Sequence, residues 1–118
     1  MSKITHSEMV AGLAKSGHTI ADELTGEDAH LLHMAVGIRG EAGALLDAVK
    51  KSTVYRKPID RDNVIEELGD LEFYMEGLRQ GLGITREETI QGNIEKLGKR
   101  YNGHQYSDQQ AQDRADKQ

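Results

Sequence analysis

The sequence predicts an all-α protein, built as an antiparallel helical bundle that is completed by oligomerisation. Apolar residues recur at steps of three and four along most of the chain, whereas strict alternation is rare. Capping residues followed by acidic residues stand between these periodic segments, as expected at helix starts. The 118 residues include one Phe, no Trp and only 4% aromatic residues. A single domain with so few large side chains has a modest core, which favours association with further copies.

Helix boundaries follow from the capping and turn residues. Thr25, with acidic residues in the next turn, is typical of an N-cap, and Asp60 or Asp62 is suited to cap a later helix. Pro58, the only proline, lies in the connection between these two helices. Thr85 begins a Thr-Arg-Glu-Glu sequence, a capping-box pattern that starts the last long helix. The predicted helices cover approximately residues 7–15, 25–51, 60–83 and 85–101.

The end of the chain differs in composition from the rest. Residues 102–118 are polar, rich in Gln and Asp, and contain few apolar side chains. Such a segment has little apolar surface to bury, so its ordering is not favoured. We therefore expect one helical domain over residues 1–101 and a polar, mobile tail over residues 102–118.

Three of the predicted helices carry apolar stripes with the spacing of left-handed bundle packing. Short links between these helices favour an antiparallel arrangement. The stripe residues are Leu31, Ala35, Ile38, Ala42, Leu45 and Val49; Val64, Leu68, Leu71, Met75, Leu78 and Leu82; and Ile90, Ile94, Leu97 and Tyr101.

Glycines interrupt the first of these three helices at regular spacing. Gly37, Gly40 and Gly43 lie three residues apart, and each costs up to about 1 kcal/mol relative to Ala inside a helix. The spacing favours the close approach of another helix or of a ligand at this face. Simple tolerance of glycine is the alternative.

Acidic residues precede the stripe positions on two helices. Glu41 stands before one stripe residue, and Glu67 and Asp70, three residues apart, stand before two others. Carboxylates arranged in this way on facing helices are suited to hold Mg²⁺, a hard cation that prefers oxygen ligands. With 20 acidic residues in the chain, about three acid–x–x–acid pairs are expected by chance. A solvated acidic face is therefore the alternative for any single pair.

An amide and two cations occupy the equivalent positions on the last long helix. Asn93, Lys96 and Arg100 each precede a stripe residue. The two cations are suited to clamp phosphate oxygens, with Arg100 as the bidentate partner, and Asn93 to orient a phosphate, a sugar or a water. Cations near a helix C-terminus are also favoured by the helix dipole alone. The shared register on three helices favours a site for a polyphosphate.

Composition excludes several other classes of function. The net charge is -5 and no basic run with interleaved aromatic residues occurs, which argues against nucleic-acid binding. The absence of cysteine excludes disulfides, thiolate zinc sites and cysteine nucleophiles. No window has the length and hydropathy of a membrane span or a signal peptide. We expect a soluble, cytoplasmic protein that binds neither membrane nor nucleic acid.

These residues resemble the MazG-like, all-α nucleoside triphosphate pyrophosphohydrolases. The resemblance runs from about residue 32 to residue 101 and rests on three segments. Residues 33–43 are similar to the start of the family's first metal helix, Glu66-Glu67-Leu68-Gly69-Asp70 to its second acidic motif, and residues 93–101 to its phosphate-contacting motif.

The resemblance implies a substrate, a reaction and a set of site residues. Members of the family hydrolyse nucleoside triphosphates between the α and β phosphates with Mg²⁺, for which Mn²⁺ can substitute. They form dimers or dimers of dimers, so a homodimer or homotetramer is expected. By position, Glu41, Glu67 and Asp70 are implied as the metal-binding and catalytic residues. Asn93, Lys96 and Arg100 are implied as the substrate-binding residues.

One position departs from the family's pattern. The first motif of the family has two glutamates three residues apart, and the second of them falls on Ala44 here. Asp47, one turn further along, is a candidate replacement, although a turn is about 5 Å of rise. Three functions remain open: a pyrophosphohydrolase weakened at Ala44, a catalytically impaired nucleotide-binding or regulatory protein, and a structural interaction protein. Preference for a base or a sugar does not follow from the sequence.

Overall fold

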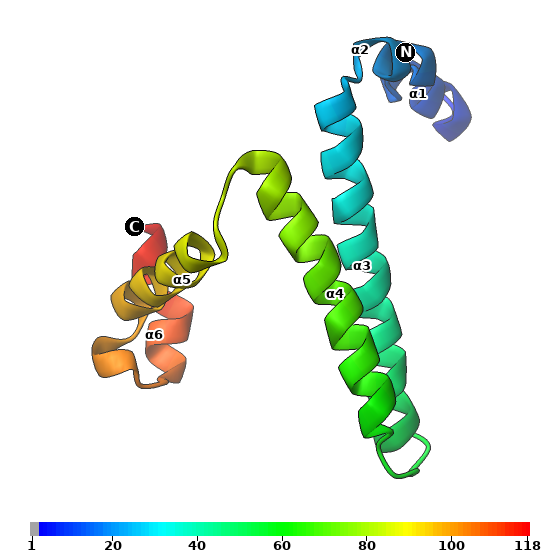
Figure 1. Ribbon diagram of the computed structural model, residues 1–118. Helices are drawn as coiled ribbons and strands as arrows, with labels where there is room; N and C mark the ends of the chain where they lie inside the picture. The colour runs from blue at the N-terminus through cyan, green and yellow to red at the C-terminus, as the bar shows by residue number, and fades with distance from the viewer. Residues whose placement is uncertain (1–2) are drawn as a thin grey trace.

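The computed structural model describes residues 3–118, and these residues form helices and connections without a β-strand (Figure 1). The protein is therefore all-α, as predicted. Short helices begin and end the chain, and long helices occupy its middle. The elements are α1 (His6–Leu13), α2 (Gly17–Glu23), α3 (Gly26–Thr53), α4 (Arg61–Leu82), α5 (Arg86–Arg100), η1 (Asn102–His104), α6 (Asp108–Asp113) and η2 (Ala115–Lys117).

The long helices begin where their capping residues predict. The Thr25 side chain accepts a hydrogen bond from the Asp28 N–H, and the Asp28 carboxylate accepts one from the Thr25 N–H, both at 3.1 Å. Thr85 starts α5 with the same reciprocal capping box, and Asp60 caps α4 by accepting from a backbone N–H. Helix α2 was not predicted, because Ser16 precedes it without a side-chain cap and Gly17 begins it.

Helices α3 and α4 form an antiparallel hairpin that contains the core of the chain (Figure 1). Among the described residues, Met34 and Ala48 are the buried apolar side chains, and both belong to α3. The helices approach closely at Gly37, where an added methyl group would overlap the Tyr74 ring. The close approach predicted for the α3 glycines is therefore confirmed at Gly37. Gly40, by contrast, faces open space.

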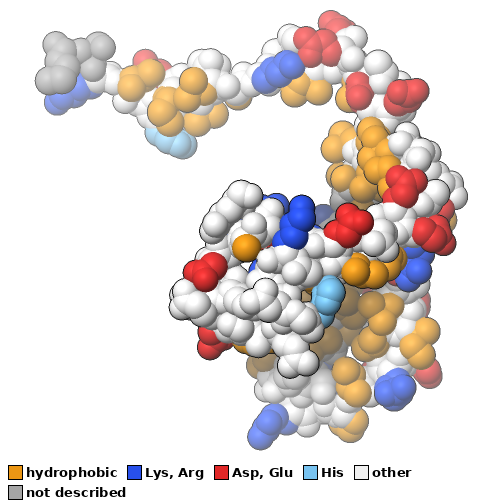
Figure 2. All heavy atoms as spheres, turned by 90° about the vertical axis from the view of Figure 1, so that its left-hand side faces the viewer, with side chains coloured by type: hydrophobic (Ala, Val, Ile, Leu, Met, Phe, Trp, Pro, Cys, Tyr) orange, Lys and Arg blue, Asp and Glu red, His pale blue; other side chains and the backbone are white. Residues whose placement is uncertain are grey.

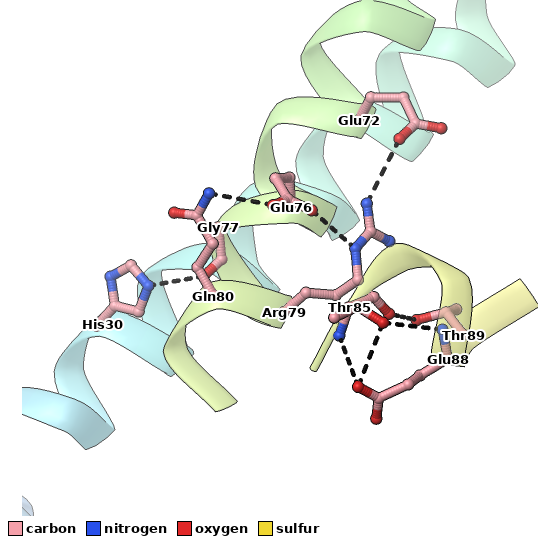
Figure 3. A network of polar contacts seen from close by, with 9 residues as sticks. All are labelled: His30, Glu72, Glu76, Gly77, Arg79, Gln80, Thr85, Glu88 and Thr89. Atoms are coloured by element: carbon pink, nitrogen blue, oxygen red, sulfur yellow. Dashed lines mark hydrogen bonds and ion pairs between the residues drawn. The ribbon is translucent and has the colours of Figure 1, made fainter. Parts of the chain in front are cut away.

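A polar network stiffens the C-terminal end of α4 (Figure 3). The Arg79 side chain is buried although charged, and its guanidinium contacts Glu76 at 3.0 Å and Glu72 at 3.8 Å. The His30 ring lies 2.8 Å from the Gly77 carbonyl oxygen and ties α3 to this end of α4. Gly83 then ends α4 with φ 68°, a left-handed conformation that glycine adopts without strain.

Helix α5 does not join the α3–α4 hairpin within this chain. It projects from the end of α4 and packs against η1, α6 and η2 instead (Figure 1). Its stripe residues Ile90 and Ile94 consequently remain 44% and 48% exposed. The radius of gyration is 20.6 Å, compared with about 13 Å for a compact domain of similar length. A single chain therefore supplies an antiparallel helix pair and a separate third helix.

The segment predicted as a polar tail, residues 102–118, has a folded conformation. Its helices α6 and η2 lie against α5, and the Gln110 side chain accepts a hydrogen bond from the Asn102 N–H at 3.1 Å. The Tyr101 and Tyr106 rings lie with their centroids 5.7 Å apart. The contact of this segment with α5 was not foreseen, because it depends on an ion pair and a pair of tyrosine rings rather than on a periodic apolar stripe.

Large apolar side chains lie open on the hairpin. Figure 2 shows them on its surface behind the unit formed by α5 and α6. Leu46 is 66% exposed and Phe73 is 67% exposed. Exposed apolar surface of this kind is typical of sites that contact another molecule. Within residues 3–118, no helix combines the length and the apolar character required to cross a membrane.

Candidate functional site

Three of the predicted carboxylates meet between α3 and α4. One oxygen each of Glu41, Glu67 and Asp70 lies within 4.8 Å of the other two. Glu67 and Asp70 share a face of α4 because they are three residues apart, and Glu41 reaches them from α3. We call this group the carboxylate cluster. It is formed by helices that already pack together, so a single chain contains it.

The cluster holds carboxylates closer than their mutual repulsion favours. The pKa of Glu67 is raised above its ordinary value, first by a hydrogen bond shared with Glu41, then by desolvation and by the negative charges of Glu41 and Asp70. Glu41 and Glu67 are half-buried, whereas Asp70 is exposed. Such a group retains a proton more readily than a free carboxylate, and a bound cation relieves the same repulsion.

The position of Glu41 results from how the two helices pack. The contact face of α3 runs through Met34, Gly37, Glu41 and Ala48, with small side chains on either side of the glutamate. The spacing of apolar residues instead predicted Glu41 beside the stripe and Ala42 within it, yet Ala42 is exposed. Part of the predicted stripe, including Ala42, therefore faces away from α4, and Glu41 lies at the contact between the two helices.

Among residues 3–118, no further acidic side chain joins Glu41, Glu67 and Asp70 in the cluster. Ala44, one turn on, is half-buried and offers only a methyl group. Asp47 is exposed and does not belong to the carboxylate cluster. The cluster therefore contains three acidic residues, and the replacement suggested for Ala44 is not part of it.

The predicted phosphate-contacting residues lie on α5, away from the carboxylate cluster. Asn93 and Lys96 are exposed. Figure 1 shows α5 standing apart from the hairpin that carries the acidic residues. Within one chain, the structure thus does not bring Asn93, Lys96 and Arg100 together with the carboxylates.

Arg100 is already paired with a carboxylate of its own chain. Its Nε donates to Asp116 Oδ1 at 2.7 Å and its Nη2 to Asp116 Oδ2 at 3.1 Å. The side chains of Arg100 and Asp116 are only 16% and 2% exposed. The hydrogen bonds from Arg100 lower the pKa of Asp116, and the nearby charge of Lys96 lowers it further. Sequence reasoning missed Asp116, because a pair sixteen residues apart has no helical periodicity to reveal it.

Tyr74 of α4, whose ring contacts Gly37, lies between the two helices that carry the carboxylate cluster. Tyr74 packs its ring against Gly37 and meets the His33 ring edge-on, with centroids 6.1 Å apart. These contacts account for both residues as packing groups between α3 and α4.

The fold and the cluster define an all-α protein with an acidic site between two antiparallel helices. A family model, the MazG nucleotide pyrophosphohydrolase domain, matches residues 29–104, which is more than half of the chain. The chain belongs to this family. No match was found among curated proteins or among solved structures. The matched region includes α3, α4 and α5 almost entirely, and with them the carboxylate cluster.

Proposed function

We propose that the protein is a Mg²⁺-dependent nucleoside triphosphate pyrophosphohydrolase that converts an NTP or dNTP to the monophosphate and pyrophosphate. The observation that carries this proposal is the convergence of Glu41, Glu67 and Asp70 to within 4.8 Å on two packed helices. Membership of the MazG family supports the reaction class. The low exposure of the cluster's glutamates favours a specific site over a solvated acidic face.

The donor set fits a hard divalent cation. All three groups offer carboxylate oxygens, which Mg²⁺ and Mn²⁺ prefer, and exposed Asp70 leaves one side of the site open to solvent and substrate. A bound cation would offset the neighbouring negative charges that contribute to the raised pKa of Glu67, which supports a metal at the cluster. When bound there, the metal supplies charge neutralisation for phosphate oxygens and makes a water more acidic.

The protein's own residues have distinct roles in this proposal. Glu41 and Glu67 would hold the metal from the two helices, and their half-buried side chains have little freedom to move away from it. Asp70 completes the ligand set at the solvent side. Lys96 and Asn93 contact the phosphates, and Arg100 does so when it is free of Asp116. A lysine charge beside the departing pyrophosphate stabilises the negative charge that develops there.

We further propose that the active form is a homodimer or a dimer of dimers. The open apolar surface of the hairpin and the large radius of gyration support association, since a lone chain buries few apolar side chains. Because α5 stands apart from its own hairpin, association also provides a way to bring phosphate-contacting residues to a carboxylate cluster. The helical bundle is then completed between chains.

Ala44 favours a second candidate function, a nucleotide-binding or regulatory protein with impaired catalysis. A position that lacks a carboxylate reduces the negative charge available to the metal and lowers its affinity. Under this alternative, nucleotide binds saturably and turnover is very low. Under the main proposal, three carboxylates suffice for measurable hydrolysis.

The test is pyrophosphate release from a panel of ribo- and deoxynucleoside triphosphates, measured with Mg²⁺ or Mn²⁺. The parent chain is compared with Glu67→Ala and Ala44→Glu. Release by the parent that disappears in Glu67→Ala supports the enzyme. A silent parent with an active Ala44→Glu variant supports the impaired nucleotide-binding protein. Silence of both across the panel contradicts the metal-site proposal.

A further inference from the structure

The strongest polar contact outside the carboxylate cluster joins α5 to the C-terminal segment, residues 102–118. Asp116 of η2 accepts two hydrogen bonds from the planar fork of Arg100. Carboxylate and phosphate present similar pairs of oxygens to such a fork, so either group satisfies it. Asp116 therefore occupies the bonding positions that a substrate phosphate requires on Arg100.

The second cation of the predicted phosphate clamp has a weaker influence on the same carboxylate. Lys96 lies one helical turn before Arg100, and its charge contributes to the lowered pKa of Asp116. Arg100 forms the ion pair with Asp116, and Lys96 adds only the weaker attraction of a nearby positive charge. The guanidinium of Arg100 therefore already binds an anionic group of its own chain.

The C-terminal segment is held at this position by further contacts. A His104 ring nitrogen lies 3.4 Å from the Ile94 carbonyl oxygen of α5, and the Tyr106 ring lies 5.7 Å, between centroids, from the ring of Tyr101 directly after α5. These contacts are few, and Tyr106 remains 74% exposed, so they bury little apolar surface. A segment held mainly by polar contacts opens at lower cost than a packed core helix.

We propose that the C-terminal segment is an autoinhibitory clasp, in which Asp116 holds Arg100 until a polyphosphate displaces it. This inference rests on the phosphate-contacting role proposed for α5. Nucleotide binding and release of the segment are then coupled, because one guanidinium cannot serve both oxygen pairs at once. Removing the Asp116 charge removes the competitor and tightens phosphate binding.

The experiment measures binding of tripolyphosphate, a probe without base or sugar, by calorimetry in the absence of divalent metal. Asp116→Asn is compared with the parent chain and with Asp113→Asn, which makes the same charge change in the same segment without touching Arg100. We expect Asp116→Asn to bind about tenfold more tightly than the parent, and Asp113→Asn to remain within about twofold of the parent. Equal or weaker binding by Asp116→Asn overturns the clasp and leaves Asp116 a purely structural partner.

A second measurement covers the case in which Asp116→Asn loses helix content. In the parent chain, saturating tripolyphosphate should raise amide hydrogen exchange in residues 105–118 while α3 and α4 stay protected. Unchanged exchange in that segment overturns the clasp. The outcome is separable from that of the proposed function, because hydrolysis is read from pyrophosphate release and its dependence on Glu67, neither of which enters this binding measurement.

Discussion

The contact between Gly37 and Tyr74 sets the spacing of the helices that carry the carboxylate cluster. Gly37 lies one turn before Glu41, and a methyl group there would overlap the Tyr74 ring. Alanine at this position gains up to about 1 kcal/mol of helix propensity. The overlap, which involves three atoms of the ring, costs about 2–3 kcal/mol, the upper part of the overpacking range, because the ring and its helix must shift. We therefore expect Gly37→Ala to be destabilising by about 1–2 kcal/mol.

The same substitution reports on the site as well as on stability. A displaced α3 moves Glu41 relative to Glu67, so metal affinity falls together with stability. Gly40→Ala is the matched control, because Gly40 lies on the same helix and faces open space. In thermal unfolding we expect Gly37→Ala to lower Tm by roughly 5–10 °C, and Gly40→Ala to leave Tm unchanged or slightly raised.

Stabilisation by Mn²⁺ gives the functional measurement for this pair. The rise in Tm on adding Mn²⁺ should be smaller for Gly37→Ala than for the parent, and equal to the parent for Gly40→Ala. A Gly37→Ala protein as stable as the parent, with the same metal response, would refute the proposed helix contact. Destabilisation of similar size by Gly40→Ala would also contradict the assignment of the helix contact to Gly37.

The remaining predictions concern the missing carboxylate, the pH dependence and the association of chains. Ala44→Glu should lower the Kd for Mn²⁺ by roughly tenfold or more, measured by titration, because it adds a ligand beside Glu41. The raised pKa of Glu67 means that its stabilising contribution in the metal-free protein is present below the ordinary Glu pKa and is lost as pH rises through the folded-state pKa. Glu67→Gln should abolish that pH dependence, which is read as the difference between the Tm-versus-pH profiles of the parent and of the variant. In the parent, saturating Mg²⁺ should reduce the loss of stability as pH rises. Leu46→Glu should shift the sedimentation coefficient towards that of a monomer, since Leu46 lies 66% exposed on the hairpin surface.

Each of these predictions has its own contradicting result. An Ala44→Glu variant with unchanged Mn²⁺ affinity places position 44 outside the metal site. Parallel Tm profiles for the parent and Glu67→Gln contradict the shared proton at Glu67. Lys99→Glu, a charge change at an exposed polar position, is the control for association, and dissociation by both variants would indicate a general charge effect.

Local sequence signals predicted the helix starts well because the information is local. The capping boxes at Thr25 and Thr85 satisfy backbone groups within four residues, and the structure contains both. The three-residue spacing of Glu67 and Asp70 placed them on one face for the same reason. The convergence with Glu41 followed from pairing two such helices.

The features that were missed depend on long-range packing. An apolar stripe does not specify which neighbour it faces, so Ala42 was assigned to the contact that Glu41 in fact occupies. Helix α5 was expected beside the hairpin, although the turn after Gly83 directs it away within one chain. The pairing of Arg100 with Asp116 joins polar residues from a segment that lacks apolar periodicity, and such a pair is invisible to hydrophobic patterns.

The most direct test of the proposed metal site is equilibrium binding of Mn²⁺ to the parent chain and to Glu67→Gln, followed by electron paramagnetic resonance. Glu67→Gln preserves size and removes the charge, and its helix content is checked by circular dichroism. If the carboxylate cluster holds the metal, the parent binds Mn²⁺ and folded Glu67→Gln loses most of this binding. Equal binding by the two proteins would contradict the assignment of the metal to the carboxylate cluster.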